Sequence, residues 1–127
     1  MSAPAWIDAI VRDFGRAAGL DDFALNERGA AALSFETGLE LRLEHAYDSL
    51  VVAVTVPSPA TPDAARRILH SAHPAARHGF KLRAGYLPKT SRAVFAARLA
   101  DREVTLPALN TAFNALWRIA LDFGGAP

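Results

Sequence analysis

Residues 33–56 read LSFETGLELRLEHAYDSLVVAVTV and predict a run of antiparallel β-strands. Leucine and charged residues alternate over 39–44, which indicates a strand that is buried on one side and faces water on the other. Residues 50–56 are rich in valine and almost entirely apolar, as is typical of a central strand. The polar links at 36–38 and 46–48 are short enough for hairpins, so with residues 31–35 this stretch predicts a three-stranded meander.

A helical pattern precedes the meander. Residues 4–18 carry an apolar stripe that includes Trp6 and Phe14, with charged residues on the opposite side. Gly19 follows directly, where a left-handed residue commonly ends a helix. We expect this helix to bury its stripe, including Trp6 and Phe14, in the core.

Two further helices and two strands are predicted after the meander. Thr61 before Pro62 indicates the start of a helix that ends before Pro74. Alternation over 80–87 and the apolar run over 92–99 predict a pair of strands. The last helix is expected over about 105–123, and its apolar stripe, which includes Phe113 and Trp117, is expected to lie in the core.

The predicted order of elements is α-β-β-β-α-β-β-α. This order predicts a single α+β domain over 1–127, with an antiparallel sheet and helices packed on one face. The chain has 127 residues, of which 51% are hydrophobic and 21% charged, as expected for one globular domain.

The sequence contains no cysteine, which excludes disulfides, thiolate metal sites and cysteine nucleophiles. The N-terminus lacks the pattern of a secretory signal, and the longest purely apolar run, 50–54, is too short to span a bilayer, so we expect no membrane insertion.

The charges are unevenly distributed along the chain. The formal net charge is only +1, yet residues 1–63 carry four basic and ten acidic side chains, a net of −6. Residues 64–100 carry eight basic side chains and no acidic one, a net of +8, and residues 101–127 carry a net of −1. This asymmetry favours either an anionic partner or an acidic part of one subunit facing a basic part of another.

Catalytic and metal-binding patterns are scarce, so we expect neither an enzyme nor a cofactor. His70, His73 and His78 are the best candidates for a metal site, but no carboxylate is near them in sequence, and we interpret them as surface histidines. Glu40 and Glu44 flank Arg42 on one strand face, where a solvated charged face explains them better than acid–base chemistry. A small hydrolase or metal enzyme therefore has almost no support in the sequence.

The basic segment 64–100 leaves a second function class open. Aromatic residues are interleaved with its arginines and lysines, namely Phe80, Tyr86 and Phe95. Such a mixture is found in small nucleic-acid-binding or regulatory modules. No DNA- or RNA-binding motif accompanies it, so we keep this reading as the alternative.

The order of elements and several local patterns resemble the class I type III secretion chaperones, in particular the Tir-chaperone (CesT-like) family. The matching stretches extend over nearly the whole chain: FGRAAGL at 14–20, LNERG at 25–29, LSF at 33–35, LELRL at 39–43, ILHSA at 68–72, VTLPALN at 104–110 and LW at 116–117.

The resemblance implies a non-enzymatic homodimer in the bacterial cytoplasm, a chaperone in virulence-associated protein secretion. It would hold the N-terminal segment of a secreted effector in an extended path and assist its transfer to the secretion apparatus, with the secretion ATPase as a further expected partner. The positions that the resemblance implies for effector binding are Phe14, Leu20, Phe35, Leu41 and Leu43. Those implied for the dimer contact are Ile68, Leu69, Ala72 and Leu82. Combined with the charge distribution, this predicts a basic dimer side and an acidic meander side with apolar patches.

Overall fold

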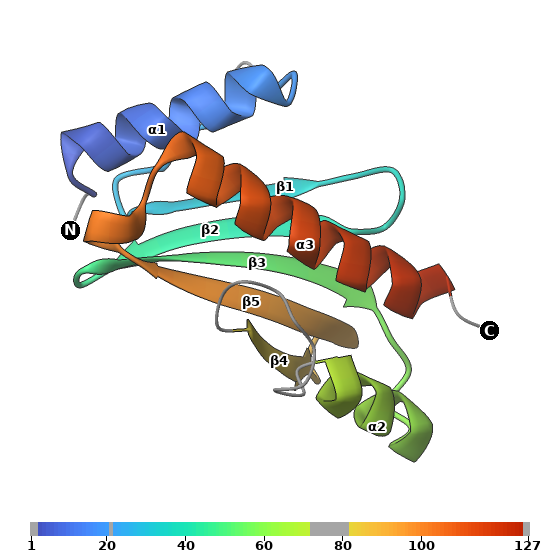
Figure 1. The fold of residues 1–127 in the computed structure, drawn as a ribbon. Coiled ribbons are helices and arrows are strands. Elements are labelled where there is room, and N and C mark those ends of the chain that lie inside the picture. The colour runs from blue at the N-terminus through green and yellow to red at the C-terminus, as the bar shows by residue number, and fades with distance from the viewer. Residues whose placement is uncertain (1–2, 21, 72–81, 126–127) are drawn as a thin grey trace.

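A computed structural model describes residues 3–20, 22–71 and 82–125, and it shows one sheet with helices laid against it (Figure 1). The sheet is antiparallel and five-stranded, in the order β1-β2-β3-β5-β4. Its strands are β1 (Ala30–Ser34), β2 (Glu40–Ala46), β3 (Ser49–Pro57), β4 (Leu82–Leu87) and β5 (Arg92–Ala100). The helices are α1 (Ala5–Ala17), α2 (Pro62–Ser71) and α3 (Leu106–Gly125), with a 3₁₀ turn η1 (Asp101–Glu103) before α3. The predicted fold class and order of elements are confirmed, and no described helix is long and apolar enough to cross a membrane.

The strand register separates the sheet into an apolar face and a face of small and charged residues. One ladder of paired residues crosses all five strands on the apolar face: Leu33, Leu41, Val54, Phe95 and Ala84. The ladder one step along reads Ala32, Arg42, Ala53, Ala96 and Arg83 on the opposite face. The alternation over 39–44 therefore predicted correctly which side of β2 is buried, because successive strand residues point to opposite faces.

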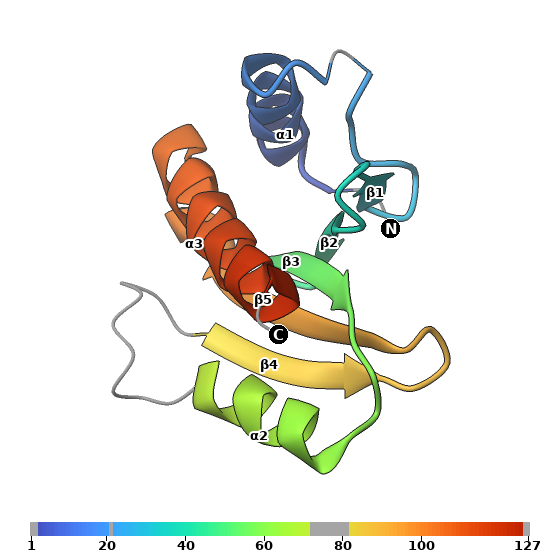
Figure 2. The same ribbon diagram turned by 90° about the vertical axis from the view of Figure 1, so that its right-hand side faces the viewer.

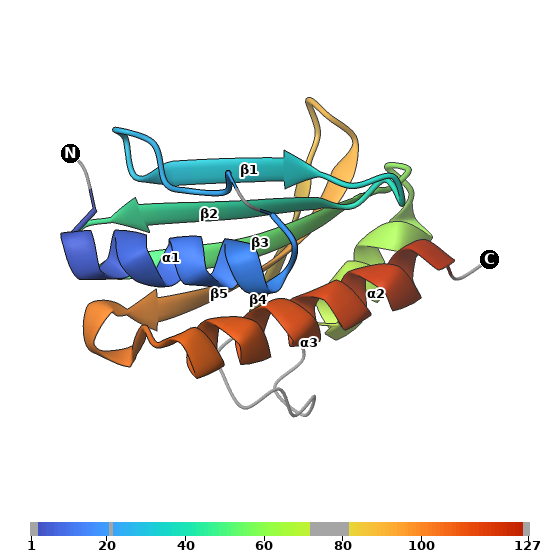
Figure 3. The ribbon, with the colours of Figure 1, turned by 90° about the horizontal axis from the view of Figure 1, so that it is seen from above.

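The helices contribute to the core on the apolar face. Helix α3 packs across β3 and β5, α1 lies beside α3, and α2 lies against β4 (Figures 2 and 3). Ile7 of α1, Ile68 of α2 and Leu116 of α3 are at most 4% exposed and join one apolar cluster with the strand residues. Trp6 is different: it is 48% exposed, so its expected place in the core is wrong.

The ends of the helices follow the predicted signals. The backbone N–H of Leu20 donates to the Gly15 carbonyl at 2.7 Å, and Gly19 has a φ of 80°, which together form a Schellman-type end of α1. Thr61 Oγ1 accepts the Ala64 N–H at 3.1 Å at the start of α2. Thr105 Oγ1 accepts the Ala108 N–H at the same distance at the start of α3.

Arg92 ties β5 to β3 and to the turn between β1 and β2. Its Nε donates to Thr55 Oγ1 at 2.7 Å, and its Nη2 donates to the carbonyls of Gly38 and Thr55. Thr55 is fully buried, so loss of Arg92 would leave its hydroxyl without this donor. This arginine, one of the eight basic residues of segment 64–100, therefore has a structural role.

We expect Arg92→Met to lower the free energy of unfolding by about 2 kcal/mol, because hydrogen bonds to a charged donor contribute about 1.5–3 kcal/mol. Urea unfolding followed by circular dichroism measures this. Arg118→Met, at an exposed position of α3, is the matched control and should change stability by less than about 0.5 kcal/mol. Equal stabilities of the two variants would contradict the role assigned to Arg92.

Candidate functional site

Five aromatic rings form a row where α1, α3 and the end of β1 meet. The ring centroids lie 6.3 Å apart for Phe23 and Phe14, 5.3 Å for Phe14 and Phe113, 5.5 Å for Phe113 and Trp117, and 4.7 Å for Trp117 and Phe35. Phe14 and Phe23 are buried, whereas the other three are only half-buried. The row therefore begins in the core and ends at the surface.

Two hollows lie along the same part of the molecule. One, of about 460 Å³, lies between the segment that follows α1 and strand β1, and Leu20, Phe23 and Leu33 are among its lining residues. The other, of about 350 Å³, lies between the end of α3 and the turn before β2, and it is lined in part by Leu39 and Leu121. We call the partly or fully exposed apolar residues of this region the apolar strip: Leu20, Leu33, Phe35, Phe113, Trp117 and Leu121.

Strand β1 is an edge strand of the sheet beside the apolar strip. It pairs with β2 on one side only, and the Asn26 N–H donates to the Ala30 carbonyl at the start of its other side. An edge strand offers main-chain donors and acceptors to an added strand. Together, β1 and the strip provide backbone pairing and apolar contacts for an extended chain.

The structure separates the five positions predicted for effector binding into two groups. Leu20 and Phe35 are half-buried members of the strip. Phe14, Leu41 and Leu43 are at most 2% exposed, so they lie in the core and present no surface to a partner. The expectation for these three is corrected: they belong to the apolar cluster that the helices and strands form together, and local periodicity does not reveal how far that cluster extends.

Other residues of the strip were not predicted as binding residues. Phe113 and Trp117 were expected in the core, and Leu33 and Leu121 were not singled out. Leu121 is 42% exposed. The available signal was the width of the apolar stripe on α3: Leu116 and Ala120 are buried, whereas Phe113 and Trp117 at its side are only half-buried.

The residues predicted for the dimer contact also differ in position. Ile68 is 4% exposed and packs in the core of the single chain, so it presents no surface for a contact between copies. Leu69, its neighbour on α2, is 69% exposed, and Leu82 is half-buried against the core. Ala72 lies outside the described residues.

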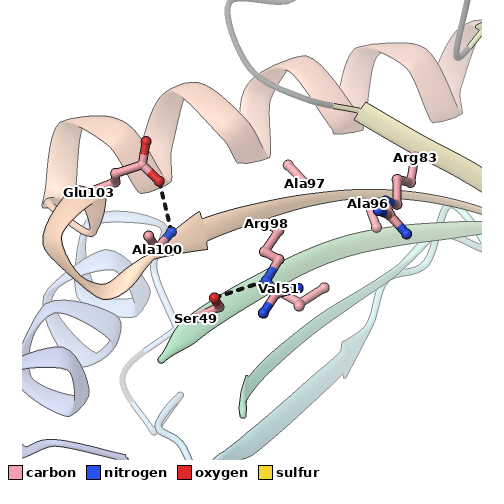
Figure 4. Close-up of a pocket in the computed structure, with 8 residues that line it drawn as sticks. All are labelled: Ser49, Val51, Arg83, Ala96, Ala97, Arg98, Ala100 and Glu103. Atoms are coloured by element: carbon pink, nitrogen blue, oxygen red, sulfur yellow. Dashed lines mark hydrogen bonds between the residues drawn. The ribbon is translucent and has the colours of Figure 1, made fainter. Parts of the chain in front are cut away.

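Acidic and basic residues share one face of the sheet but lie mainly on different strands. Two acidic residues of the meander, Glu40 and Glu44, lie on β2, where Glu40 is paired with Arg42. Exposed arginines lie on the same face of the sheet, beyond β3, at Arg83 of β4 and Arg98 of β5 (Figure 4). Two basic residues of the same segment serve internal contacts: Arg92, described above, and Arg67, whose guanidinium lies 4.4 Å from the centroid of the Phe123 ring.

The part of the chain that the structure describes gives little support for a catalytic or metal-binding site. It contains no group of three or more His, Asp and Glu that could hold a metal ion, and His73 and His78 lie outside it. His45 Nε2 lies 2.8 Å from Asp101 Oδ1, which resembles part of a catalytic dyad. Ser49 Oγ, however, contacts Asp48 and Arg98 rather than His45, so it is not activated by this pair. The pair links β2 to η1.

The comparisons with solved structures agree in fold. The chain is similar to the structure of the ExsC-ExsE complex, with 19% identity, a TM-score of 0.81 and coverage of 98% of this chain and 96% of that one. It is also similar to the heterodimeric ExoU-SpcU complex from the type III secretion system of Pseudomonas aeruginosa, with 17% identity, a TM-score of 0.68 and coverage of 94% and 95%. YbjN, a putative transcription regulator from E. coli, shares the fold at 13% identity with a TM-score of 0.63 and coverage of 96% and 93%. These likenesses show the fold alone.

The sequence comparisons give the family. No curated protein matches the chain. The family model of the type III secretory system chaperone SycN, in contrast, matches residues 6–123, which extend from the start of α1 to the end of α3. The chain therefore belongs to the SycN family of type III secretory system chaperones.

Proposed function

We propose that this protein binds the extended N-terminal segment of a type III secreted effector and keeps it competent for export. The observation that carries the proposal is the apolar strip beside the free edge of β1. An extended peptide added to β1 gains affinity from main-chain hydrogen bonds, and the two flanking hollows select its apolar side chains. The HopA1-SchA chaperone-effector complex has a similar fold, and this supports the same use here.

The chaperone acts without chemistry of its own in this proposal. It needs neither a cofactor nor a metal, works in the bacterial cytoplasm and passes its effector to the secretion apparatus, including the secretion ATPase. We propose further that it is related to the Tir-chaperone (CesT-like) group, which its sequence patterns resemble. Isothermal titration with the effector's N-terminal segment tests the binding step. Loss of binding in variants of the strip supports the proposal, and salt-dependent binding of nucleic acid in place of the segment would overturn it.

The second element of the proposal is that the chaperone is a homodimer, with α2 as the contact suggested by the resemblance. Ile68 is occupied in the core, so Leu69 is the large apolar side chain that α2 offers to another copy. Leu82 on β4 and Ala72, which lies outside the described residues, complete the contact proposed from the sequence.

For this contact we expect Leu69→Asp to raise the dimer dissociation constant by at least tenfold, because a charge buried without a partner is costly. Analytical ultracentrifugation over a range of micromolar concentrations measures the change. Ala65→Asp, at an exposed position of α2 one turn earlier, is the matched control. A dimer that tolerates Leu69→Asp unchanged would show that α2 is not the contact.

A further inference from the structure

Alternate residues of β1 direct their main-chain groups to opposite sides of the strand. The His45 N–H donates to the Gly29 carbonyl at 2.7 Å, and the Phe35 N–H donates to the Leu39 carbonyl at 2.9 Å, so the odd-numbered residues bond toward β2. In an antiparallel pair the residues between them turn their main-chain groups the other way. Three residues of β1 therefore have main-chain groups that point to the free edge: Ala30, Ala32 and Ser34.

The chain itself already occupies the first of these three positions. The Asn26 N–H donates to the Ala30 carbonyl at 2.8 Å, and the Ala30 N–H donates to Asn26 Oδ1 at 3.1 Å. The same Oδ1 accepts the Arg28 N–H at 2.9 Å, which holds the loop between them in shape. Asn26 thus satisfies both main-chain groups of Ala30, as a paired strand residue would.

The other two positions are open. The described residues supply no hydrogen bond to the outward N–H and carbonyl groups of Ala32 and Ser34, and both residues are exposed. Open edge groups pair readily with another strand, so natural proteins normally cover them. On β1 this cover ends after Ala30, and the open groups lie beside the apolar strip.

We propose that Asn26 sets the register of the segment that adds to β1, so that the segment pairs with Ala32 and Ser34 and is excluded from Ala30. The inference rests on the proposed function and adds which part of the edge the segment uses. The Ala30 N–H has one proton to donate, so Asn26 and an added strand compete for it. Asn26 is part of the same chain and holds the position before a segment arrives.

The register determines which side chains of the segment reach the apolar strip. Successive strand residues point to opposite faces. Leu33 lies on the apolar face between the two open positions, and it lines a hollow together with Leu20 and Phe23. The segment residue opposite Leu33 therefore faces this hollow, whereas its two neighbours face the side of the sheet that carries Glu40 and Arg42. The edge thus favours a segment with the pattern polar–apolar–polar.

Disulfide trapping tests the register on the full chain, because the sequence contains no cysteine. Ala30→Cys, Ala32→Cys and Ser34→Cys each introduce one thiol, and paired strand residues have Cα atoms about 5.5 Å apart, within reach of a disulfide. The probe is the synthetic peptide STLCLTS, whose leucines point away from its cysteine in a strand. At equilibrium in glutathione buffer, mass spectrometry measures the mixed disulfide with the peptide relative to that with glutathione. This trapping ratio should be about tenfold lower at position 30 than at 32 and 34, because two main-chain hydrogen bonds are missing there.

Variants of Asn26 separate register from accessibility. Asn26→Ala removes the acceptor of the Ala30 N–H, so the trapping ratio of the Ala30→Cys chain should rise about fivefold. Asn26→Asp keeps an oxygen acceptor at this position and should leave the ratio unchanged. Glu27→Ala, at the exposed neighbouring position, is the matched control and should also leave it unchanged.

The background ratio comes from Lys89→Cys, at an exposed position in the turn after β4, the opposite edge strand. Equal ratios at positions 30 and 32, both above background, would overturn the register and leave the proposed function standing, as would a ratio that does not respond to Asn26→Ala. Background ratios at all three positions of β1 would refute strand addition at this edge, and the proposed function with it. The peptide STSCSTS, without leucines, should be trapped at background level, and trapping equal to that of STLCLTS would refute the apolar position of the pattern.

Discussion

Trp117→Asp is expected to weaken binding of the effector segment by about 30- to 100-fold. Trp117 lies in the middle of the apolar strip, between the ring of Phe35 at 4.7 Å and that of Phe113 at 5.5 Å. Tryptophan is enriched among residues whose loss costs 2 kcal/mol or more in an interface, and 1.4 kcal/mol corresponds to a tenfold change in affinity. A carboxylate at this position also has to give up water when a peptide covers it. Titration calorimetry with the effector segment measures the effect.

Two further variants keep this prediction independent of folding. Leu121→Asp changes a side chain that is 42% exposed on the same strip, so the fold should remain intact while binding weakens at least fivefold. Arg118→Asp changes the residue next to Trp117 on α3, is exposed and should leave affinity nearly unchanged. Unaltered binding in both Trp117→Asp and Leu121→Asp would refute the strip as the binding surface.

Gly15→Ala is expected to lower the free energy of unfolding by about 2–3 kcal/mol, although alanine normally favours a helix over glycine by about 1 kcal/mol. A Cβ on Gly15 would lie 2.8 Å from the Cβ of Phe23 and 2.9 Å from the carbonyl oxygen of Leu20. Neither atom is at the flexible end of a side chain, so the segment that follows α1 has to shift. Because that segment lines one of the two hollows, effector binding should weaken as well.

Thermal and urea unfolding of Gly15→Ala measure this effect. Gly85→Ala is the control, since a Cβ there would meet Val94 Cγ1 at 3.6 Å, an ordinary contact. The control should change stability by less than about 1 kcal/mol. A Gly15→Ala protein as stable as the unchanged one would contradict the close packing of α1 against the segment after it.

Local sequence signals predicted the elements of the fold well. The leucine alternation over 39–44 identified the buried side of β2, and Thr61 and Gly19 marked helix ends that the structure confirms. These signals act within a few residues, so they need no knowledge of the rest of the chain. The order of the strands, with β5 between β3 and β4, depends on contacts distant in sequence and was not predicted.

The candidate site was harder to predict from the sequence, again because it depends on contacts between residues distant in sequence. Leu41 and Leu43 have the pattern of exposed binding residues and of core residues alike, and only the packing of the helices against the apolar face of the sheet decides that they are buried. Trp117 differs in the opposite direction. Its place in the helical stripe predicts a core residue, yet its side chain remains half-buried. Periodicity identifies which residues share a face, while the extent of the covering element decides which of them a partner can reach.

Hydrogen exchange of the protein with and without the effector segment tests the central claim most directly. The account predicts that the segment slows exchange in the edge strand β1 and around Phe35, while the bound segment itself gains protection only where it pairs with β1 and forms no globular domain of its own. Two results would contradict the account. One is a segment that binds while exchange in β1 and at the apolar strip stays unchanged. The other is a bound effector segment that is folded as a globular domain.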